Sequence, residues 1–225
     1  MIRKKAIEFV KKHKNLYSSF EYECLIDGLN NIDMPEIFTV EIVREILDEL
    51  GYIPNNYNIY DSYSSLIDDI HGVEGKNIIE IGGGRFPCLG KRISLMQAKG
   101  SVTVYDPNLF ADYSLDNLIL KRKMASKNTN VDDCDLLIGL MPCKGAEVVL
   151  DLALDNNKDF MLWLCEGGPH GDEFDFFEDD REWRNSLIGY TCNKAKNNGM
   201  GDIKIKYLDR FSSNFPIIYN VRNSK

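Results

Sequence analysis

The sequence has no long hydrophobic run, so it predicts no membrane-spanning helix. Such a helix needs about 20 consecutive apolar residues, whereas the longest apolar runs, around 136–141 and 160–165, are only as long as a strand. Charged residues also interrupt the start of the chain, where a secretory signal needs an uninterrupted apolar region. We therefore expect a cytoplasmic protein with no membrane partner.

The sequence also lacks the spacings of metal-ligating and disulfide-forming cysteines. None of the six cysteines forms a CxxC pair, and the three histidines do not complete a zinc-binding pattern. A chain of 225 residues is long enough to bury a large core without such links. We expect no metal site and six reduced thiols, at Cys24, Cys88, Cys134, Cys143, Cys165 and Cys192.

Basic residues are in deficit. The chain has 27 Lys and Arg residues against 35 Asp and Glu residues, a net charge of −8. This acidity counts against a general nucleic-acid binder, because phosphate neutralisation requires Lys and Arg. The charge is uneven: residues 1–15 carry six basic residues and one acidic residue, or +5, and residues 166–182 carry eight acidic residues and one basic residue, or −7. We interpret both stretches as solvated surface, with the acidic one alternatively lying near a cationic substrate group.

Apolar residues at helical spacing dominate the first 75 residues. The clearest helix spans 39–50, where Thr39 can cap the N-terminus and Gly51 can end the helix. A further helix is expected at 62–70. We expect residues 1–75 to form an N-terminal helical cap, a lid over a second domain made of residues 76–225.

From residue 76 onward, short apolar strands alternate with helices. Near-continuous apolar strands indicate a parallel sheet that is covered on both faces. The last two strands are joined too closely for a parallel crossover, so they must be antiparallel. The predicted fold class is therefore α/β, with a seven-stranded, mostly parallel Rossmann-like sheet and an antiparallel C-terminal hairpin. The expected strands are 77–81, 102–105, 118–120, 135–140, 160–164, 203–208 and 215–221.

A glycine cluster, Gly82-Gly83-Gly84, stands between the first expected strand and a helix. Glycines at such a point let the backbone turn tightly and approach a ligand, and the following helix offers main-chain N–H groups. Asp106 ends the next strand, 22 residues after Gly84, where a carboxylate can accept hydrogen bonds from ribose hydroxyls. A dinucleotide dehydrogenase requires GxGxxG, and Pro87 at the sixth position breaks that fingerprint.

The pattern E-x-G-x-G, followed by an acidic residue after the next strand and by a closing hairpin, resembles class I S-adenosylmethionine-dependent methyltransferases over residues 76–223. The resemblance implies S-adenosylmethionine as the cofactor, with Glu80 and Gly82 at its methionine end and Asp106 at its ribose. The family's acidic adenine contact is not evident after the third expected strand. The implied cofactor-binding residues are Glu80, Gly82, Gly83, Gly84, Phe86, Asp106, Pro107, Leu140 and Met141.

The acceptor side of this site carries fewer signals. Methyl transfer is an in-line displacement, which needs orientation and exclusion of water, and it needs a base only if the acceptor arrives protonated. Tyrosines before the sheet have apolar faces and polar tips suited to enclosing a small molecule, which we expect as the acceptor; docking of the N-terminal helices on the sheet is the simpler interpretation of the same residues. The oligomeric state stays open. The candidate residues are Tyr57, Tyr60, Pro142 and Cys143 for the substrate, and Glu166 and His170 for catalysis.

Three other functions fit the same residues. Cys143 after the fourth strand and Cys165 after the fifth resemble the nucleophile positions of DNA and RNA pyrimidine carbon-5 methyltransferases, in which a thiolate adds to the base. Packing of both thiols at strand ends is the simpler interpretation. The chain could instead transfer an aminobutyryl group from S-adenosylmethionine, as in enzymes that resemble nicotianamine synthase. It could also bind the cofactor without catalysis.

Overall fold

The computed structural model describes residues 2–17, 19–30, 46, 48, 50, 59–110, 115–165, 180–208 and 215–221. Most of the helix expected at 39–50 lies outside the described residues, as do the site candidates Tyr57, Glu166 and His170. The chain separates into two compact units, residues 1–58 and residues 59–225. Among the described segments, no helix has both the length and the apolarity needed to cross a bilayer.

The first unit contains two helices, α1 (Ile2–Lys12) and α2 (Ser19–Asn30), with a short 3₁₀ helix, η1 (Lys14–Leu16), between them. Ala6 and Val10 of α1 are fully buried, and so is Leu25 of α2. This spacing of four residues places apolar side chains on one face of a helix, and the lysines of α1 are exposed. The helical character expected for this part of the chain is confirmed, and its role as a lid stays a prediction.

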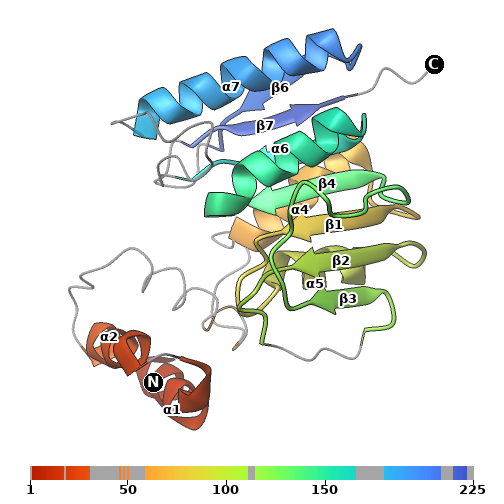
Figure 1. Ribbon diagram of the computed structural model, residues 1–225. Helices are drawn as coiled ribbons and strands as arrows, with labels where there is room; N and C mark the ends of the chain where they lie inside the picture. The colour runs from red at the N-terminus through yellow and green to blue at the C-terminus, as the bar shows by residue number, and fades with distance from the viewer. Residues whose placement is uncertain are drawn as a thin grey trace. The chain divides into compact units, whose positions relative to one another are not determined.

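The second unit is built on seven strands: β1 (Asn77–Ile81), β2 (Ser101–Tyr105), β3 (Leu118–Lys121), β4 (Leu136–Leu140), β5 (Asp159–Trp163), β6 (Ile203–Lys206) and β7 (Ile217–Asn220). They form one sheet in the order β3-β2-β1-β4-β5-β7-β6 (Figure 1). The first five strands pair in parallel, whereas β7 runs antiparallel to both β5 and β6. The predicted fold class, with its mostly parallel sheet and antiparallel C-terminal hairpin, is confirmed.

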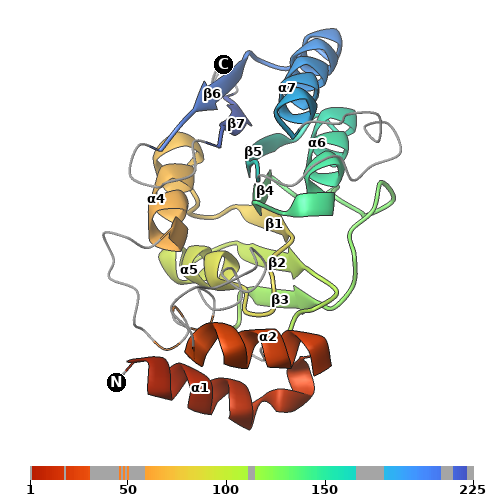
Figure 2. The ribbon, with the colours of Figure 1, turned by 90° about the vertical axis from the view of Figure 1, so that its left-hand side faces the viewer.

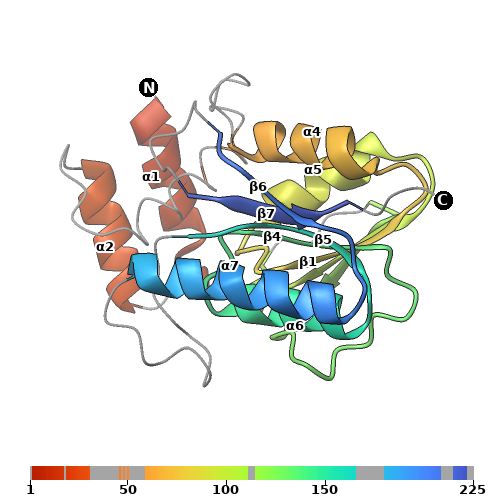
Figure 3. The same ribbon diagram turned by 90° about the horizontal axis from the view of Figure 1, so that it is seen from above.

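Helices cover both faces of this sheet (Figures 2 and 3). α4 (Ile59–His71) and α5 (Cys88–Met96) lie on one face, and α6 (Ala146–Asp155) and α7 (Asp180–Asn197) lie on the other. Successive strand residues point to opposite faces, so a strand between two helical layers is buried along its whole length. Leu136, Leu137 and Ile138 of β4 are all fully buried for this reason. The apolar runs in the sequence are the central strands of this sandwich.

The boundary between the units differs from the one expected after residue 75, because α4 belongs to the sheet unit. Tyr63 of α4 is fully buried. Its hydroxyl lies 3.1 Å from the carbonyl oxygen of Gly139 on β4 and 2.9 Å from that of Met161 on β5, and its ring packs on Trp163. A single tyrosine therefore attaches α4 to two neighbouring strands, which a local helical pattern does not reveal.

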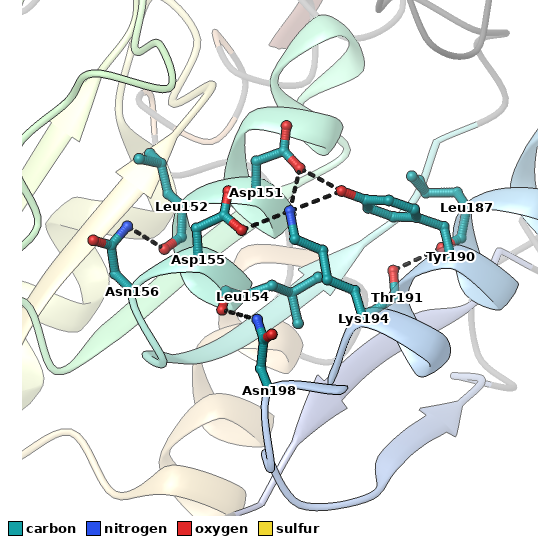
Figure 4. A network of polar contacts seen from close by, with 10 residues as sticks. All are labelled: Asp151, Leu152, Leu154, Asp155, Asn156, Leu187, Tyr190, Thr191, Lys194 and Asn198. Carbon is teal, nitrogen blue, oxygen red and sulfur yellow. Dashed lines mark hydrogen bonds and ion pairs between the residues drawn. The ribbon is translucent and has the colours of Figure 1, made fainter. Parts of the chain in front are cut away.

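A polar network joins α6 to α7 on the other face (Figure 4). Lys194 of α7 donates hydrogen bonds to Asp151 at 3.2 Å and to the Tyr190 hydroxyl at 2.8 Å, and pairs with Asp155 at 2.8 Å. Tyr190 in turn donates to Asp151 at 2.9 Å. Lys194 and Asp151 are partly buried, and these contacts hold the two helices in a defined register.

Candidate functional site

The candidate site lies where the order of the strands reverses. The chain passes from β1 to β2 and β3 on one side of the sheet, and then crosses to β4 and β5 on the other side of β1. Open α/β sheets bind ligands beyond the carboxyl ends of their strands at such a switch point. Figure 2 looks onto these carboxyl ends. Residues 82–84, which follow β1, and residues 141–143, which follow β4, are therefore neighbours at this edge.

The glycine loop takes a backbone conformation that favours glycine at two positions. Gly82 has φ of 80° and Gly84 has φ of 74°, which is the left-handed region. A Cβ atom on Gly82 would lie 2.6 Å from Cβ of Pro142, and one on Gly83 would lie 2.2 Å from Cγ1 of Val104. The loop is thus pressed against the strands beneath it, and a side chain at either position would push it outward.

Asp106 is tied to the glycine loop by its carboxylate. The Gly84 N–H donates to Oδ2 of Asp106 at 3.0 Å, and the Asn108 N–H donates to Oδ1 at 2.7 Å. A carboxylate oxygen has a second lone pair, so each oxygen can accept one further hydrogen bond. Asp106 is partly exposed and Pro107 is exposed. The two segments that the sequence assigns to the cofactor, the loop after β1 and the end of β2, therefore meet in the structure.

Glu80 lies behind this loop. It is 2% exposed, and its Oε2 has no hydrogen-bond partner among the described residues. Burial raises the pKa of Glu80 from 4.5 to about 8, and the nearby negative charge of Asp106 raises it further, while a main-chain hydrogen bond from Gly90 acts in the opposite direction. Glu80 is consequently a neutral, buried carboxyl group at pH 7 unless a cation or another donor approaches it.

Gly90 in the first turn of α5 makes room for that carboxyl group, and the sequence analysis missed it. A Cβ atom at Gly90 would lie 2.6 Å from Oε2 of Glu80 and 2.6 Å from Cγ2 of Val104. Glycine inside a helix costs about 1 kcal/mol relative to alanine, so it usually has a packing reason. That glycine in an otherwise helical pattern was the available signal.

Phe86 is buried, with 3% of its surface exposed, and it packs edge to face on Phe110 at a ring separation of 6.2 Å. The Phe110 N–H donates to the carbonyl oxygen of Arg85 at 2.9 Å, which joins the segment after β2 to the glycine loop a second time. Phe110 was not among the predicted site residues. Its position four residues after Asp106 gave no signal by itself.

The segment after β4 has an unusual backbone. Met141 has φ of 49° and Cys143 has φ of 46°, a region that costs a non-glycine residue free energy and that recurs at functional sites. The Met141 N–H donates to the carbonyl oxygen of Trp163 at 2.8 Å, which holds the end of β4 to the end of β5. Leu140 and Met141 are partly buried.

Pro142 is buried and packs against glycine positions on three sides. Cβ atoms built on Gly82, Gly139 and Gly145 would lie between 2.6 and 3.2 Å from its ring or its Cβ. The side chain therefore couples the end of β4 to the glycine loop. Its expected role in contacting a substrate stays a prediction.

One predicted candidate, Cys143, and the rival nucleophile Cys165 come together at the strand ends. Cys143 is exposed and Cys165 is buried, and their sulfur atoms lie 3.9 Å apart. Beside them, Arg184 of α7 donates to the carbonyl oxygen of Cys165 at 3.4 Å. Tyr60, by contrast, lies at the start of α4 with the Arg92 guanidinium 5.3 Å from its ring, and its role at the acceptor is untested. Within the described residues, no group of three or more His, Cys, Asp or Glu residues could hold a metal ion.

No family model matches the chain, and no curated protein matches it. Among solved structures, fibrillarin from Aeropyrum pernix with bound S-adenosyl-L-methionine is 16% identical, with a TM-score of 0.48 over 73% of this chain and 76% of that one. Precorrin-6y C5,15-methyltransferase from Geobacter metallireducens is 11% identical, with a TM-score of 0.48 over 73% and 89%. Magnesium protoporphyrin IX methyltransferase from Synechocystis is 10% identical, with a TM-score of 0.47 over 95% of both chains. Similarity this low decides nothing about activity, so the function must be argued from the geometry of this chain.

Proposed function

We propose that this protein is an S-adenosylmethionine-dependent methyltransferase that acts on a small molecule. The observation that carries the proposal is the hydrogen bond of 3.0 Å from the Gly84 N–H to Asp106. This hydrogen bond joins the glycine loop at the switch point of the sheet to a carboxylate whose remaining lone pairs can accept hydrogen bonds from two ribose hydroxyls. The sequence pattern resembles class I S-adenosylmethionine-dependent methyltransferases at the same residues.

The residues present fit this cofactor. Gly82 and Gly84 keep the loop free of side chains, so the methionine part can lie against the main chain. Glu80 offers a buried carboxyl group with an oxygen that lacks a partner among the described residues. A ligand ammonium group that approached this carboxyl group would favour its ionised form. Asp106 would accept from the ribose.

When bound, S-adenosylmethionine supplies an electrophilic methyl group, which an acceptor takes by in-line displacement. The chain has to orient both partners and exclude water. Leu140 and Met141, partly buried beside the glycine loop, provide apolar surface where the methyl group would lie. Glu166 and His170, which are outside the described residues, remain our proposed candidates for receiving a proton from the acceptor.

Calorimetric titration tests the cofactor assignment. We expect S-adenosylhomocysteine to bind, NADH not to bind, and Asp106→Ala to weaken binding at least tenfold, because the ribose loses a charged acceptor. Asp116→Ala is the matched control, since Asp116 is an exposed aspartate just before β3, at the amino ends of the strands. Absence of binding by the wild type, or equal weakening by both variants, would contradict the proposal.

The net charge of −8 supports a small-molecule acceptor over a nucleic acid. The test is formation of S-adenosylhomocysteine with a panel of small acceptors, compared with RNA and DNA. Methylthioadenosine as the product would instead show aminobutyryl transfer. Tight binding with no product over the whole panel would favour a non-catalytic cofactor-binding protein.

One observation favours a second candidate, methylation of pyrimidine carbon 5 in RNA or DNA. That reaction needs a thiol nucleophile, and the structure brings Cys143 and Cys165 to the same strand ends, 3.9 Å apart. On this hypothesis either Cys143→Ser or Cys165→Ser abolishes transfer to a nucleic acid, whereas Cys192→Ser on α7 leaves it unchanged. A serine variant at both positions that keeps full activity removes this candidate.

A further inference from the structure

Cys143 and Cys165 lie at the ends of two strands that are held side by side. β4 and β5 are parallel neighbours, with Leu140 paired to Trp163, and the Met141 N–H extends the ladder by one more hydrogen bond. Cys143 and Cys165 follow within three residues. Their sulfur atoms are 3.9 Å apart, close enough for one thiol to donate a hydrogen bond to the other.

The two sulfur atoms are close to the separation that a disulfide bond requires. A disulfide needs a separation of about 2.05 Å between the sulfur atoms and Cα atoms about 4.4–6.8 Å apart, and neighbouring strands lie about 4.8 Å apart. The two sulfur atoms, now 3.9 Å apart, would have to approach each other by roughly 2 Å to form the bond.

The two thiols differ in access to solvent. Cys143 is exposed, whereas Cys165 is 5% exposed. Redox-sensitive cysteines commonly combine an accessible thiol that meets the oxidant with a resolving thiol next to it. We propose that Cys143 and Cys165 form a site of reversible oxidation, in which a peroxide oxidises Cys143 and Cys165 closes an intramolecular disulfide.

The chemistry balances in two steps. The Cys143 sulfur attacks the peroxide, the O–O bond breaks, and hydrogen peroxide yields the sulfenic acid of Cys143 and one water. The Cys165 sulfur then displaces the hydroxyl group, which leaves as a second water with the Cys165 proton. Two electrons pass from the two thiols to the peroxide, and an external thiol reverses the reaction by exchange.

The bridge would lock the end of β4 to the end of β5 beside Pro142, which packs against Gly82 of the glycine loop. The consequence for methyl transfer rests on the proposed function, because only then does this edge face the acceptor. Formation of the bridge itself does not rest on it.

The chain carries its own reference thiols. Cys192 on α7 is exposed, as Cys143 is. Cys134 is buried, its thiol donates to the carbonyl oxygen of Leu136, and burial raises the pKa of that thiol to about 11. Peroxide that acts by exposure alone attacks Cys192 and Cys143 equally, and Cys134 stays reduced because it is protonated and shielded.

The experiment treats the full chain with an equimolar amount of hydrogen peroxide, alkylates the remaining thiols and maps peptides without reduction. We expect a Cys143–Cys165 linked peptide in the majority of molecules, alkylated Cys192 and Cys134, and recovery of both thiols with dithiothreitol. In Cys165→Ser, Cys143 should be trapped by dimedone as the sulfenic acid. Oxidation of Cys192 to the same extent, or overoxidation of Cys143 without a link, would overturn the proposal.

The outcome is independent of the cofactor assignment because no ligand is present. A chain that binds no S-adenosylhomocysteine but forms the link defeats the proposed function and leaves this inference standing. A chain that binds S-adenosylhomocysteine but forms no link does the reverse.

Discussion

The buried carboxyl group of Glu80 makes the stability of the protein depend on pH. In the folded protein its pKa is raised from 4.5 to about 8 by burial and by the charge of Asp106. Between these values the unfolded chain releases the proton and the folded chain keeps it. Stability due to this group is therefore fully present below pH 4.5 and is lost as the pH rises to about 8.

The size of the effect follows from the two pKa values. One pKa unit corresponds to about 1.4 kcal/mol, so the difference between 4.5 and about 8 corresponds to about 5 kcal/mol. Glu80→Gln keeps the shape of the side chain and cannot ionise. Its buried amide adds a constant cost of about 1–3 kcal/mol where hydrogen bonds are unmade, so the diagnostic quantity is the pH dependence and not the absolute stability.

The assay is urea unfolding of the wild type and Glu80→Gln at several pH values that span this window. The free energy of unfolding of the variant minus that of the wild type should rise steadily with pH across the window and level off above it. Glu182→Gln is the control, because Glu182 is an exposed residue of α7. Parallel pH curves for the wild type and Glu80→Gln would show that the Glu80 carboxyl group does not set this pH dependence.

Three further substitutions test how the fold supports the site. Gly90→Ala should lower the free energy of unfolding by about 1–3 kcal/mol, because the new methyl group meets the Glu80 carboxyl group. Gly189→Ala in α7, where nothing lies within 4 Å, should raise the free energy of unfolding by about 1 kcal/mol. Equal effects of the two substitutions in urea unfolding would contradict this packing. Tyr63→Phe should cost about 1–3 kcal/mol in the same assay, since two strand carbonyls lose their partner, and an unchanged midpoint would be against it. Lys194→Met should cost about 1 kcal/mol, because both aspartates lose a cation while Asp151 keeps the hydrogen bond from Tyr190 and Asp155 stays exposed to water. No loss of thermal stability would contradict a stabilising role for this network.

The strands were predictable because they are buried on both faces. A run such as Leu136-Leu137-Ile138 is apolar on both sides, which is typical of a strand buried between two layers of helices. The expected first strand, 77–81, agrees with β1 at both ends. Helix ends were less predictable. α5 ends at Met96, because Gln97 takes an extended conformation, and no residue type at this point predicts the end of a helix.

The parts of the site that escaped prediction depend on contacts between distant segments. Tyr63 lies in the helix expected at 62–70, but its contacts with β4 and β5 join segments that are far apart in the sequence. The packing of Pro142 against Gly82 likewise joins distant segments, while its expected contact with a substrate stays a prediction. The proximity of Cys143 and Cys165 follows from strand order and register, which a pattern of local periodicities does not contain. Asp106 was predictable because its spacing from the glycines is set by one strand–helix–strand unit.

The most direct test of the central claim is amide hydrogen exchange with and without S-adenosylhomocysteine. We expect slower exchange in two segments, residues 82–86 after β1 and residues 106–110 after β2, because these are the segments that meet through Asp106. We expect no change at the amino ends of the strands, around residues 115–117. Protection confined to other segments, or no protection at saturating ligand, would contradict the claim that this edge of the sheet is the cofactor site.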